Sequence, residues 1–153
     1  MGLNDNLELF LKLGEASGTR ADSSGNGRDF TDNNTVTSNP GKVGDAAQFT
    51  AANSEYLSRA DEAGLSFGNE SFSISAWIYL DTTGVAHTII AKGTGEWRVD
   101  ITSGNRVRFV LPSSSLTSTA VTLSASTWYH VVATYDSVAD LMAITINNGT
   151  AQT

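Results

Sequence analysis

Aromatic and imidazole side chains gather in the stretch STWYHVVATYDS, residues 126–137. Tryptophan and tyrosine rings can stack on the apolar faces of sugars, and a histidine can act as a general base when a nucleophile or a carboxylate lies within reach. The only other histidine, His87, belongs to a different segment, and no Ser/His/Asp arrangement can be assembled. In a strand that carries apolar residues on both faces, as this one does, burial is the usual role of aromatic residues. We therefore expect Trp128 to face the core and a partner to hold His130 without chemistry, with a sugar-stacking platform as the alternative.

Paired carboxylates are the second kind of residue that could do chemistry. Glycoside hydrolysis needs two of them about 5 Å or about 6.5–9.5 Å apart. Glu96 and Asp100 share a face of an expected strand, but four residues of strand separate them by about 13 Å. Asp61 and Glu62 are adjacent and point apart if the chain is extended. The sequence therefore predicts that this chain is not an enzyme.

The loop ADSSGNGRD, residues 21–29, has the composition of a calcium site. Calcium takes six to eight oxygen ligands from carboxylates, amide oxygens and backbone carbonyls. Asp22, Asn26 and Asp29 supply such oxygens, and the glycines between them allow a tight chain path. The spacing is not that of an EF-hand. We expect a structural Ca²⁺ held by these three residues, with an ordinary turn rich in Asx and Gly as the alternative.

Two further aromatic residues are candidates for a ligand site. Strand alternation in SFSISAWIYLD (71–81) places Tyr79 on the side opposite the apolar residues. In EWRVDIT (96–102), alternation gives Trp97 the same outward orientation. Exposed rings on a β-sheet can stack on sugars, so Trp97 and Tyr79 are the predicted ligand residues.

The elements that must position these residues are strands. Residues 7–13, LELFLKL, place leucine at every second position, which predicts a strand inside a sheet. Two stretches, 71–81 and 128–136, are expected to be central strands. Further short strands separated by Gly and Asn turns are expected at 46–50, 55–60, 87–93, 96–102, 106–111, 119–123 and 142–149. Nearly a dozen strands with hardly any helical pattern predict an all-β fold, an antiparallel β-sandwich of jelly-roll type, with residues 1–153 as a single domain.

Composition and charge exclude several functions. The net charge is −7, and the nine lysines and arginines are scattered, so no patch can neutralise several phosphates of a nucleic acid. The chain has no cysteine, which removes disulfides, thiolate metal sites and thiol nucleophiles. No apolar run approaches about 20 residues, which argues against membrane insertion. The first ten residues, MGLNDNLELF, show no secretory signal.

Several segments together resemble the laminin G-like, concanavalin A-like lectin/glucanase jelly-roll modules of the bacterial and phage type. The segments that carry this resemblance are LKLGEASGTRADSSGNGRDF, GKVGDAAQF, EYLS, SFSISAWIYLD, TIIAKG, STWYHVVATYD and ITINNG. The resemblance implies the sandwich fold, and many such modules hold a structural calcium ion. Modules of this type usually continue for a few dozen residues beyond the equivalent of ITINNG. We therefore expect the chain to be a fragment, to be completed by strands of another chain, or to close its sheet differently.

These observations predict a non-catalytic recognition module that binds a glycan or another surface ligand. The alternative is a structural or assembly protein, such as a phage virion decoration, tail or fibre component. In that case a second copy or a partner chain would complete the sandwich. Either function places the protein outside the cell or on a virion surface.

Overall fold

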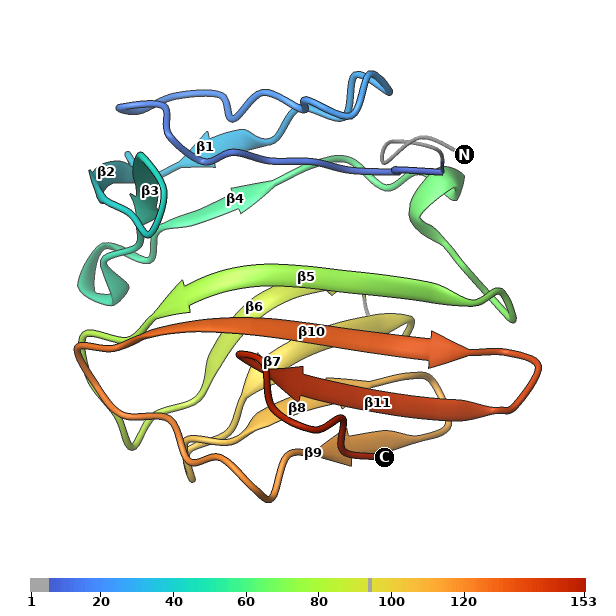
Figure 1. Ribbon diagram of the computed structural model, residues 1–153. Helices are drawn as coiled ribbons and strands as arrows, with labels where there is room; N and C mark the ends of the chain where they lie inside the picture. Colours follow the sequence, from blue (N-terminus) through green and yellow to red (C-terminus); the bar gives the residue numbers. More distant parts are fainter. Residues whose placement is uncertain (1–5, 94) are drawn as a thin grey trace. The chain divides into compact units, whose positions relative to one another are not determined.

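The computed structural model describes residues 6–93 and 95–153, and its regular structure is made of strands and two short 3-10 helices (Figure 1). In chain order the elements are β1 (Thr31–Asn33), β2 (Thr37–Pro40), β3 (Asp45–Gln48), η1 (Ala51–Asn53), β4 (Tyr56–Ser58), η2 (Ala63–Leu65), β5 (Phe72–Tyr79), β6 (His87–Lys92), β7 (Trp97–Ile101), β8 (Val107–Val110), β9 (Ser115–Thr117), β10 (Trp128–Asp136) and β11 (Leu141–Ile146). Within these described ranges, no helix is long and apolar enough to cross a membrane. The expected all-β class is confirmed.

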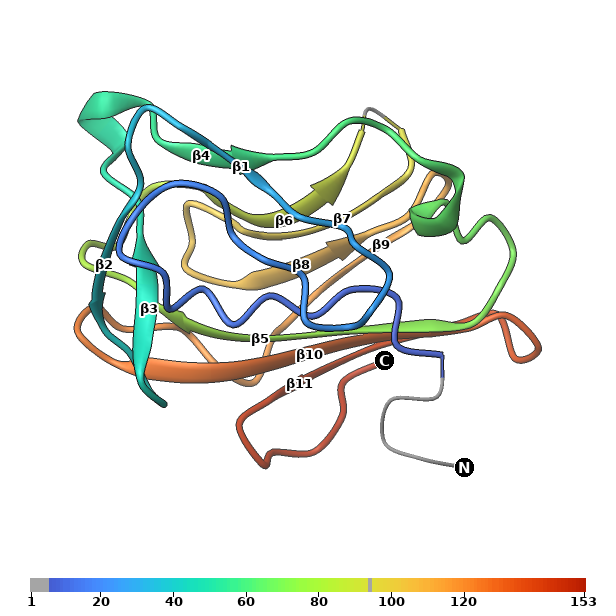
Figure 2. The same cartoon turned by 90° about the horizontal axis from the view of Figure 1, so that it is seen from above.

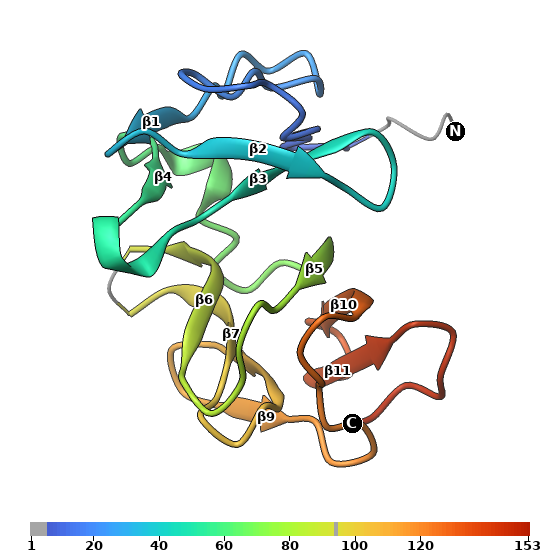
Figure 3. The ribbon, with the colours of Figure 1, turned by 90° about the vertical axis from the view of Figure 1, so that its left-hand side faces the viewer.

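The chain divides into two compact units, Met1–Gly64 and Leu65–Thr153. The second unit contains two antiparallel sheets, one with the order β11-β10-β5 and one with the order β6-β7-β8-β9. Figure 3 shows them as two layers, with β5, β10 and β11 on one side and β6, β7 and β9 on the other. This arrangement is the predicted β-sandwich. A single domain over all 153 residues stays a prediction.

The core of the second unit lies between the facing sides of its two sheets. Alternation along β5 buries one set of side chains at least partly and leaves the other set exposed, which matches the sequence pattern. Strands β7, β8, β10 and β11 add side chains that are almost fully removed from water, among them Val99, Phe109, Val131 and Ile144. Phe72 from β5 packs edge-on against Phe109, with ring centroids 5.8 Å apart, and so joins the two layers.

The two long strands that we expected to be central have different positions. Strand β10 is central, because it pairs with β11 on one side and with β5 on the other. Strand β5 lies at the edge of that three-stranded sheet, so the prediction is wrong for it. Alternation identifies which face of a strand is buried, but it carries no information about how many neighbours the strand has.

The expected strand at 119–123 is absent, and the nearest strand is β9, which ends at Thr117. The N–H groups of Thr119 and Ala120 both donate to Oε1 of Gln152, at 2.6 and 2.9 Å. Further along, the N–H of Leu123 donates to the carbonyl oxygen of Asn105 at 2.9 Å. The side chain of Gln152 and the carbonyl of Asn105 therefore satisfy the N–H groups of this segment, in place of a neighbouring strand.

The first unit is built from two short ladders joined by long polar loops. Strand β1 pairs with β4, and β2 pairs with β3, in both cases antiparallel; Figure 2 shows the partners of each pair side by side. The side chain of Arg20 is fully buried in this unit, and its guanidinium donates to the carbonyl oxygens of Gly18 and Val36 at 2.5 and 2.8 Å. The buried guanidinium of Arg20 thus satisfies two backbone carbonyl groups that lie outside the strand ladders.

Residues 7–13 do not form the strand that we predicted. The four alternating leucines are half-buried, as the pattern requires, but the only ladder contact of this segment is an isolated bridge between Leu11 and Asp22. Phe10 contacts the polar loop instead, where its carbonyl oxygen accepts from the N–H of Ser23 at 2.8 Å. Leu13 then has a positive φ of 62°, which ends the extended path.

Candidate ligand-binding face

Four ring-bearing side chains lie in two neighbouring pairs on the outer side of the β5–β10 pair. Antiparallel register places Trp128 opposite Tyr79 and His130 opposite Trp77. The ring centroids are 5.3 Å apart in the first pair and 5.0 Å apart in the second. Both pairs lie on the same side of the sheet because residues two apart on a strand share a face. We name this set, Trp77, Tyr79, Trp128 and His130, the aromatic face.

The aromatic face is open to solvent. Trp77 is 47% exposed and Tyr79 is 42% exposed, while Trp128 and His130 are half-buried. The serine residues that precede Trp77 on the same side of β5, Ser73 and Ser75, are exposed too. The face therefore combines rings with hydroxyl groups, and the inner side of β5 carries the apolar residues.

His130 is the most firmly held member of the aromatic face. Its Nε2 lies 2.8 Å from Oγ of Ser75 on the neighbouring strand. Its backbone N–H donates to Oδ1 of Asn147 at 3.0 Å, and its carbonyl oxygen accepts from the N–H of Asn147 at 2.7 Å. Asn147 has a positive φ of 55°, and this turn conformation lets it bond twice to the same residue. The expectation that a partner holds His130 is confirmed.

The expectation that Trp128 faces the core is wrong. Trp128 lies on the outer side of β10 with His130, and the inner side carries Tyr129, Val131 and Ala133. Both sides of this strand carry apolar residues, so its sequence alone does not show which side is inside. The partner strand shows which side of β10 faces outward. The outer side of β5 carries only polar or aromatic residues, and the register places Trp128 on that side.

The outward orientation that we expected for Trp97 is also wrong, whereas that of Tyr79 is confirmed. Trp97 is only 7% exposed and shares the inner side of β7 with Val99. Its Nε1 donates to the carbonyl oxygen of Leu65 at 2.8 Å, and its ring stacks on Phe67 at a centroid distance of 5.7 Å. Trp97 is thus a core residue, and Trp77, which we did not single out from the sequence, is the exposed tryptophan of β5.

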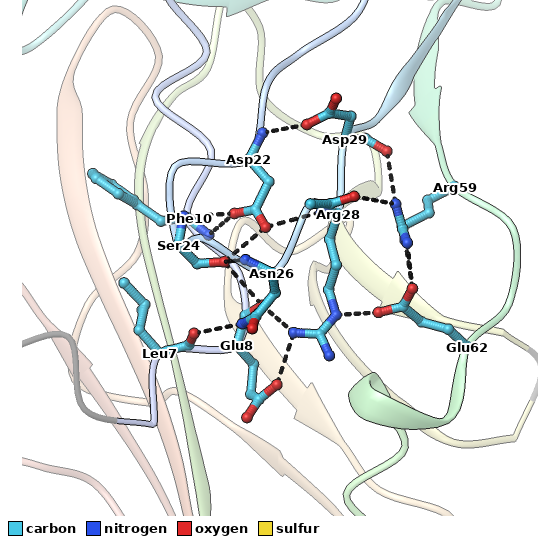
Figure 4. A network of polar contacts seen from close by, with 11 residues as sticks. Leu7, Glu8, Phe10, Asp22, Ser24, Asn26, Arg28, Asp29, Arg59 and Glu62 are labelled. Carbon is cyan, nitrogen blue, oxygen red and sulfur yellow. Dashed lines mark hydrogen bonds and ion pairs between the residues drawn. The ribbon is translucent and has the colours of Figure 1, made fainter.

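The three residues expected to bind calcium lie close together in the first unit, within a dense hydrogen-bond network (Figure 4). The backbone N–H of Asp22 donates to Oδ1 of Asp29 at 2.8 Å, and the amide of Asn26 donates to the carbonyl oxygens of Leu7 and Glu8. Burial alone would raise the pKa of Asp22, but hydrogen bonds from Phe10, Ser24 and Arg28 hold it far below its ordinary value. Among the described residues, no group of three or more His, Cys, Asp and Glu side chains is placed to hold a metal ion.

Two of the four acidic side chains that we weighed as catalytic groups, Asp100 and Glu62, are bound to arginines. Asp100 contacts Arg98 and Arg108 at 2.9 and 2.8 Å; burial opposes their effect, yet the two arginines hold its pKa below the ordinary value. Hydrogen bonds from Arg59 and Arg28 likewise lower the pKa of Glu62, with burial opposing them. A carboxyl group that acts as a general acid near neutral pH needs a raised pKa. Neither Asp100 nor Glu62 has this property.

Comparison with known proteins agrees with the fold. Residues 51–152 match a laminin G family model described as the Concanavalin A-like lectin/glucanases superfamily. This chain belongs to that superfamily. The matched part runs from η1 to the bridge at Gln152 and so includes both sheets of the sandwich and the aromatic face, whereas the loop 21–29 lies outside it. No curated protein and no solved structure matches the chain.

Membership of the superfamily suggests a ligand-binding module of the concanavalin A-like type. The description names lectins, which bind carbohydrate, and glucanases, which cleave it. The fold supports both activities, so the chemistry of particular residues must decide between them.

Proposed function

We propose that this protein is a non-catalytic module that binds a glycan on the aromatic face. The observation that carries the proposal is the side-by-side placement of two ring pairs, Tyr79 with Trp128 and Trp77 with His130, on one open side of the sheet. Sugar rings present C–H groups on their apolar faces, and these pack on aromatic rings. Two neighbouring ring pairs offer a surface for more than one sugar unit.

Polar groups beside the rings would supply the hydrogen bonds that orient a sugar. The hydroxyl of Ser75 and the imidazole of His130 are already bonded to each other next to Trp77, so they are held in place before a ligand arrives. Groups that are ordered in advance lose less entropy on binding. A sugar hydroxyl can bond to either of them.

The charge of the chain favours a neutral glycan. With a net charge of −7, the protein repels polyanionic polysaccharides at a distance, and this repulsion weakens with added salt. The module is non-catalytic in this proposal because the aromatic face contains no carboxylate, and a glycosidase needs two. Binding displayed polysaccharide fits the expected location outside the cell or on a virion surface, which remains part of the proposal.

Affinity electrophoresis through gels that contain neutral polysaccharides tests this function. We expect at least one neutral β-glucan, xylan, mannan or galactan to retard the protein. Trp77→Ala should reduce the affinity by roughly fivefold, since one aromatic contact is worth about 1 kcal/mol. The control is Tyr56→Ala, which removes a 52% exposed ring from β4, outside the aromatic face. Retardation as strong in both Trp77→Ala and Trp128→Ala as in the wild type would rule out the aromatic face as the site.

The second candidate function, assembly, is favoured by the part of the β11 edge that precedes Ile144. The N–H and C=O groups of Ile144 both bond to Gln152, at 2.9 Å, so they point away from β10. Alternation places the N–H and C=O of Met142 on the same open side. A hollow beside Met142 is lined by Leu141, by residues 113–116 next to β9, and by Thr153. An extended strand from a second copy of this chain would fit along this edge.

Light scattering over a range of concentrations tests assembly. A dimer of the wild-type chain that Met142→Pro converts to monomer would support strand addition, because proline removes the N–H that faces the open edge without removing a bond to β10. Unchanged circular dichroism of the variant is the control. A monomer at every concentration would count against assembly of this protein with itself.

A further inference from the structure

The loop 21–29 has the composition of a calcium site, but oxygens of Asp22, Gly27 and Asp29 that a cation could use already accept hydrogen bonds. We infer that the guanidinium of Arg28 is the resident cation of this loop, so that the loop holds its fold without calcium. The inference is independent of glycan binding, since every residue that it uses belongs to the first unit.

Asp22 is the first reason. A carboxylate has about four acceptor positions, two on each oxygen. Its Oδ1 accepts from the backbone N–H groups of Phe10 and Ser24, at 3.0 and 2.9 Å. Its Oδ2 accepts from Oγ of Ser24 at 2.7 Å and from the N–H of Arg28 at 3.0 Å. Four donors thus occupy the four positions, and none is left to bind a metal.

The orientation of the neighbouring amide is the second reason. Asn26 directs its NH₂ group at the carbonyl oxygens of Leu7 and Glu8, at 2.9 and 3.1 Å, so it uses two oxygens that a cation could have taken. The carbonyl oxygens of Gly27 and Asp29 both accept from Nη1 of Arg59 at 3.3 Å. These oxygens face hydrogen-bond donors instead of a common centre.

Arg28 occupies the place among the acidic groups that a metal ion would need. Its Nη1 donates to the carbonyl oxygen of Glu8 at 2.5 Å and contacts the carboxylate of Glu8 at 2.7 Å, while its Nε donates to the carboxylate of Glu62 (Figure 4). Gly64 leaves the space for this group, because a Cβ at position 64 would overlap Nη2 of Arg28. The hydrogen bond that Arg28 donates to Glu62 raises the pKa of Arg28, although burial opposes it, so the positive charge is permanent. A calcium ion beside it would be repelled.

Thermal unfolding with and without calcium tests the inference on the intact chain. We expect the wild-type Tm to be the same in excess EDTA and in millimolar CaCl₂. A bound structural calcium at 100-fold excess over its Kd would raise the Tm of a chain of this size by about 5–10 °C. A Tm increase of this size, or a calcium isotherm in titration calorimetry, would overturn the inference.

Arg28→Ala tests whether the guanidinium serves as the cation. The variant leaves the carboxylates of Glu8 and Glu62 and the carbonyl oxygen of Glu8 around an emptied space, so its Tm should fall in EDTA and rise when CaCl₂ is added. Arg106→Ala is the control, because it removes an arginine whose guanidinium donates to the carbonyl oxygen of Thr119 in the second unit, and it should show no response to calcium. If Arg28→Ala is as insensitive to calcium as the wild type, the inference fails.

Arg28→Lys covers the case in which Arg28→Ala does not fold in either buffer. Lysine keeps the positive charge but loses the planar set of donors. We expect Arg28→Lys to fold without calcium, with a Tm between those of the wild type and Arg28→Ala, and to ignore added CaCl₂. If Arg28→Lys is as unfolded as Arg28→Ala, a positive charge at position 28 does not stabilise the loop. That result would overturn the inference.

Discussion

Tyr79 and Trp128 lie opposite each other in the ladder between β5 and β10, and their ring centroids are 5.3 Å apart. Cross-strand ring pairs of this kind stabilise a sheet in addition to what their burial contributes. Here the pair stands on the outer side of the sandwich, where Tyr79 is 42% exposed. The same contact can therefore stabilise the sheet and present a surface to a ligand.

We predict that Trp128→Ala lowers the free energy of unfolding by about 1 kcal/mol, which is the usual worth of an aromatic pair beyond its buried area. The change should be small because the ring is half-buried and no packed core forms around it. Urea unfolding followed by circular dichroism measures it. A loss above 3 kcal/mol would show that the ring is part of the core, as we expected from the sequence.

For Trp97→Ala we predict a much larger loss, of about 3–5 kcal/mol, because a buried tryptophan leaves a cavity when it is removed. The variant also removes the Nε1 donor to the carbonyl oxygen of Leu65 and one of the two rings, Trp97 and Phe72, on which Phe67 stacks. Acrylamide quenching gives a second measurement on the folded protein. Removing Trp97 should increase the quenched fraction of the fluorescence, since the tryptophans that remain, Trp77 and Trp128, are exposed or half-buried.

These tryptophans show how far strand alternation can be read from the sequence. The pattern predicts the strand and its two faces in both β5 and β10. In β5 the inner side is apolar and the outer side is mostly serine, so the orientation of Tyr79 follows directly. In β10 both sides carry apolar or aromatic residues, so the choice between them depends on the partner strand, and Trp128 was assigned to the wrong side. In β7 alternation groups Trp97 with Val99 and Ile101, opposite Arg98 and Asp100, so the outward assignment of Trp97 went against the pattern itself.

The polar loop shows a different limit. Its Asp, Asn, Ser and Gly residues correctly predict a tight, irregular segment. The sequence does not show that Arg28 folds back onto Glu8 and Glu62, because these contacts join residues 20 and 34 positions apart. Composition names the oxygens that could bind a cation, but only the structure shows which donors already bind them.

The stability of the protein should depend on pH through Asp22. Its pKa in the folded state lies well below the ordinary value of 3.8, so folding favours the ionised form. This contribution is complete above the unfolded-state pKa near 4, and it is lost as the pH falls below that value towards the folded-state pKa. We predict a decline in urea stability between about pH 4 and pH 2 that is less steep in Asp22→Asn.

Asp22→Asn should also be less stable than the wild type at neutral pH. Asparagine keeps one acceptor oxygen but turns an NH₂ group towards donors, so some of the N–H groups of Phe10, Ser24 and Arg28 lose their partner. Each unsatisfied donor costs about 1–3 kcal/mol when it is shielded from water, and less here because the loop is partly exposed. Asp136→Asn is the control, since Asp136 caps the exposed turn after β10. Equal pH profiles for the two variants would show that Asp22 has no special role.

Gly64 provides a test of the space around Arg28 that leaves every charge in place. We predict that Gly64→Ala destabilises the protein by about 1–3 kcal/mol, the usual result of adding a methyl group where packing leaves no room. The methyl group would overlap Nη2 of Arg28, and contacts with Glu8 and Glu62 prevent the guanidinium from moving away freely. Gly104→Ala is the matched control: a Cβ there would lie 3.6 Å from Oγ1 of Thr102, an ordinary contact, so the change should stay within about 0.5 kcal/mol. Equal stability of the two alanine variants in urea would mean that the guanidinium does not fill the space beside Gly64.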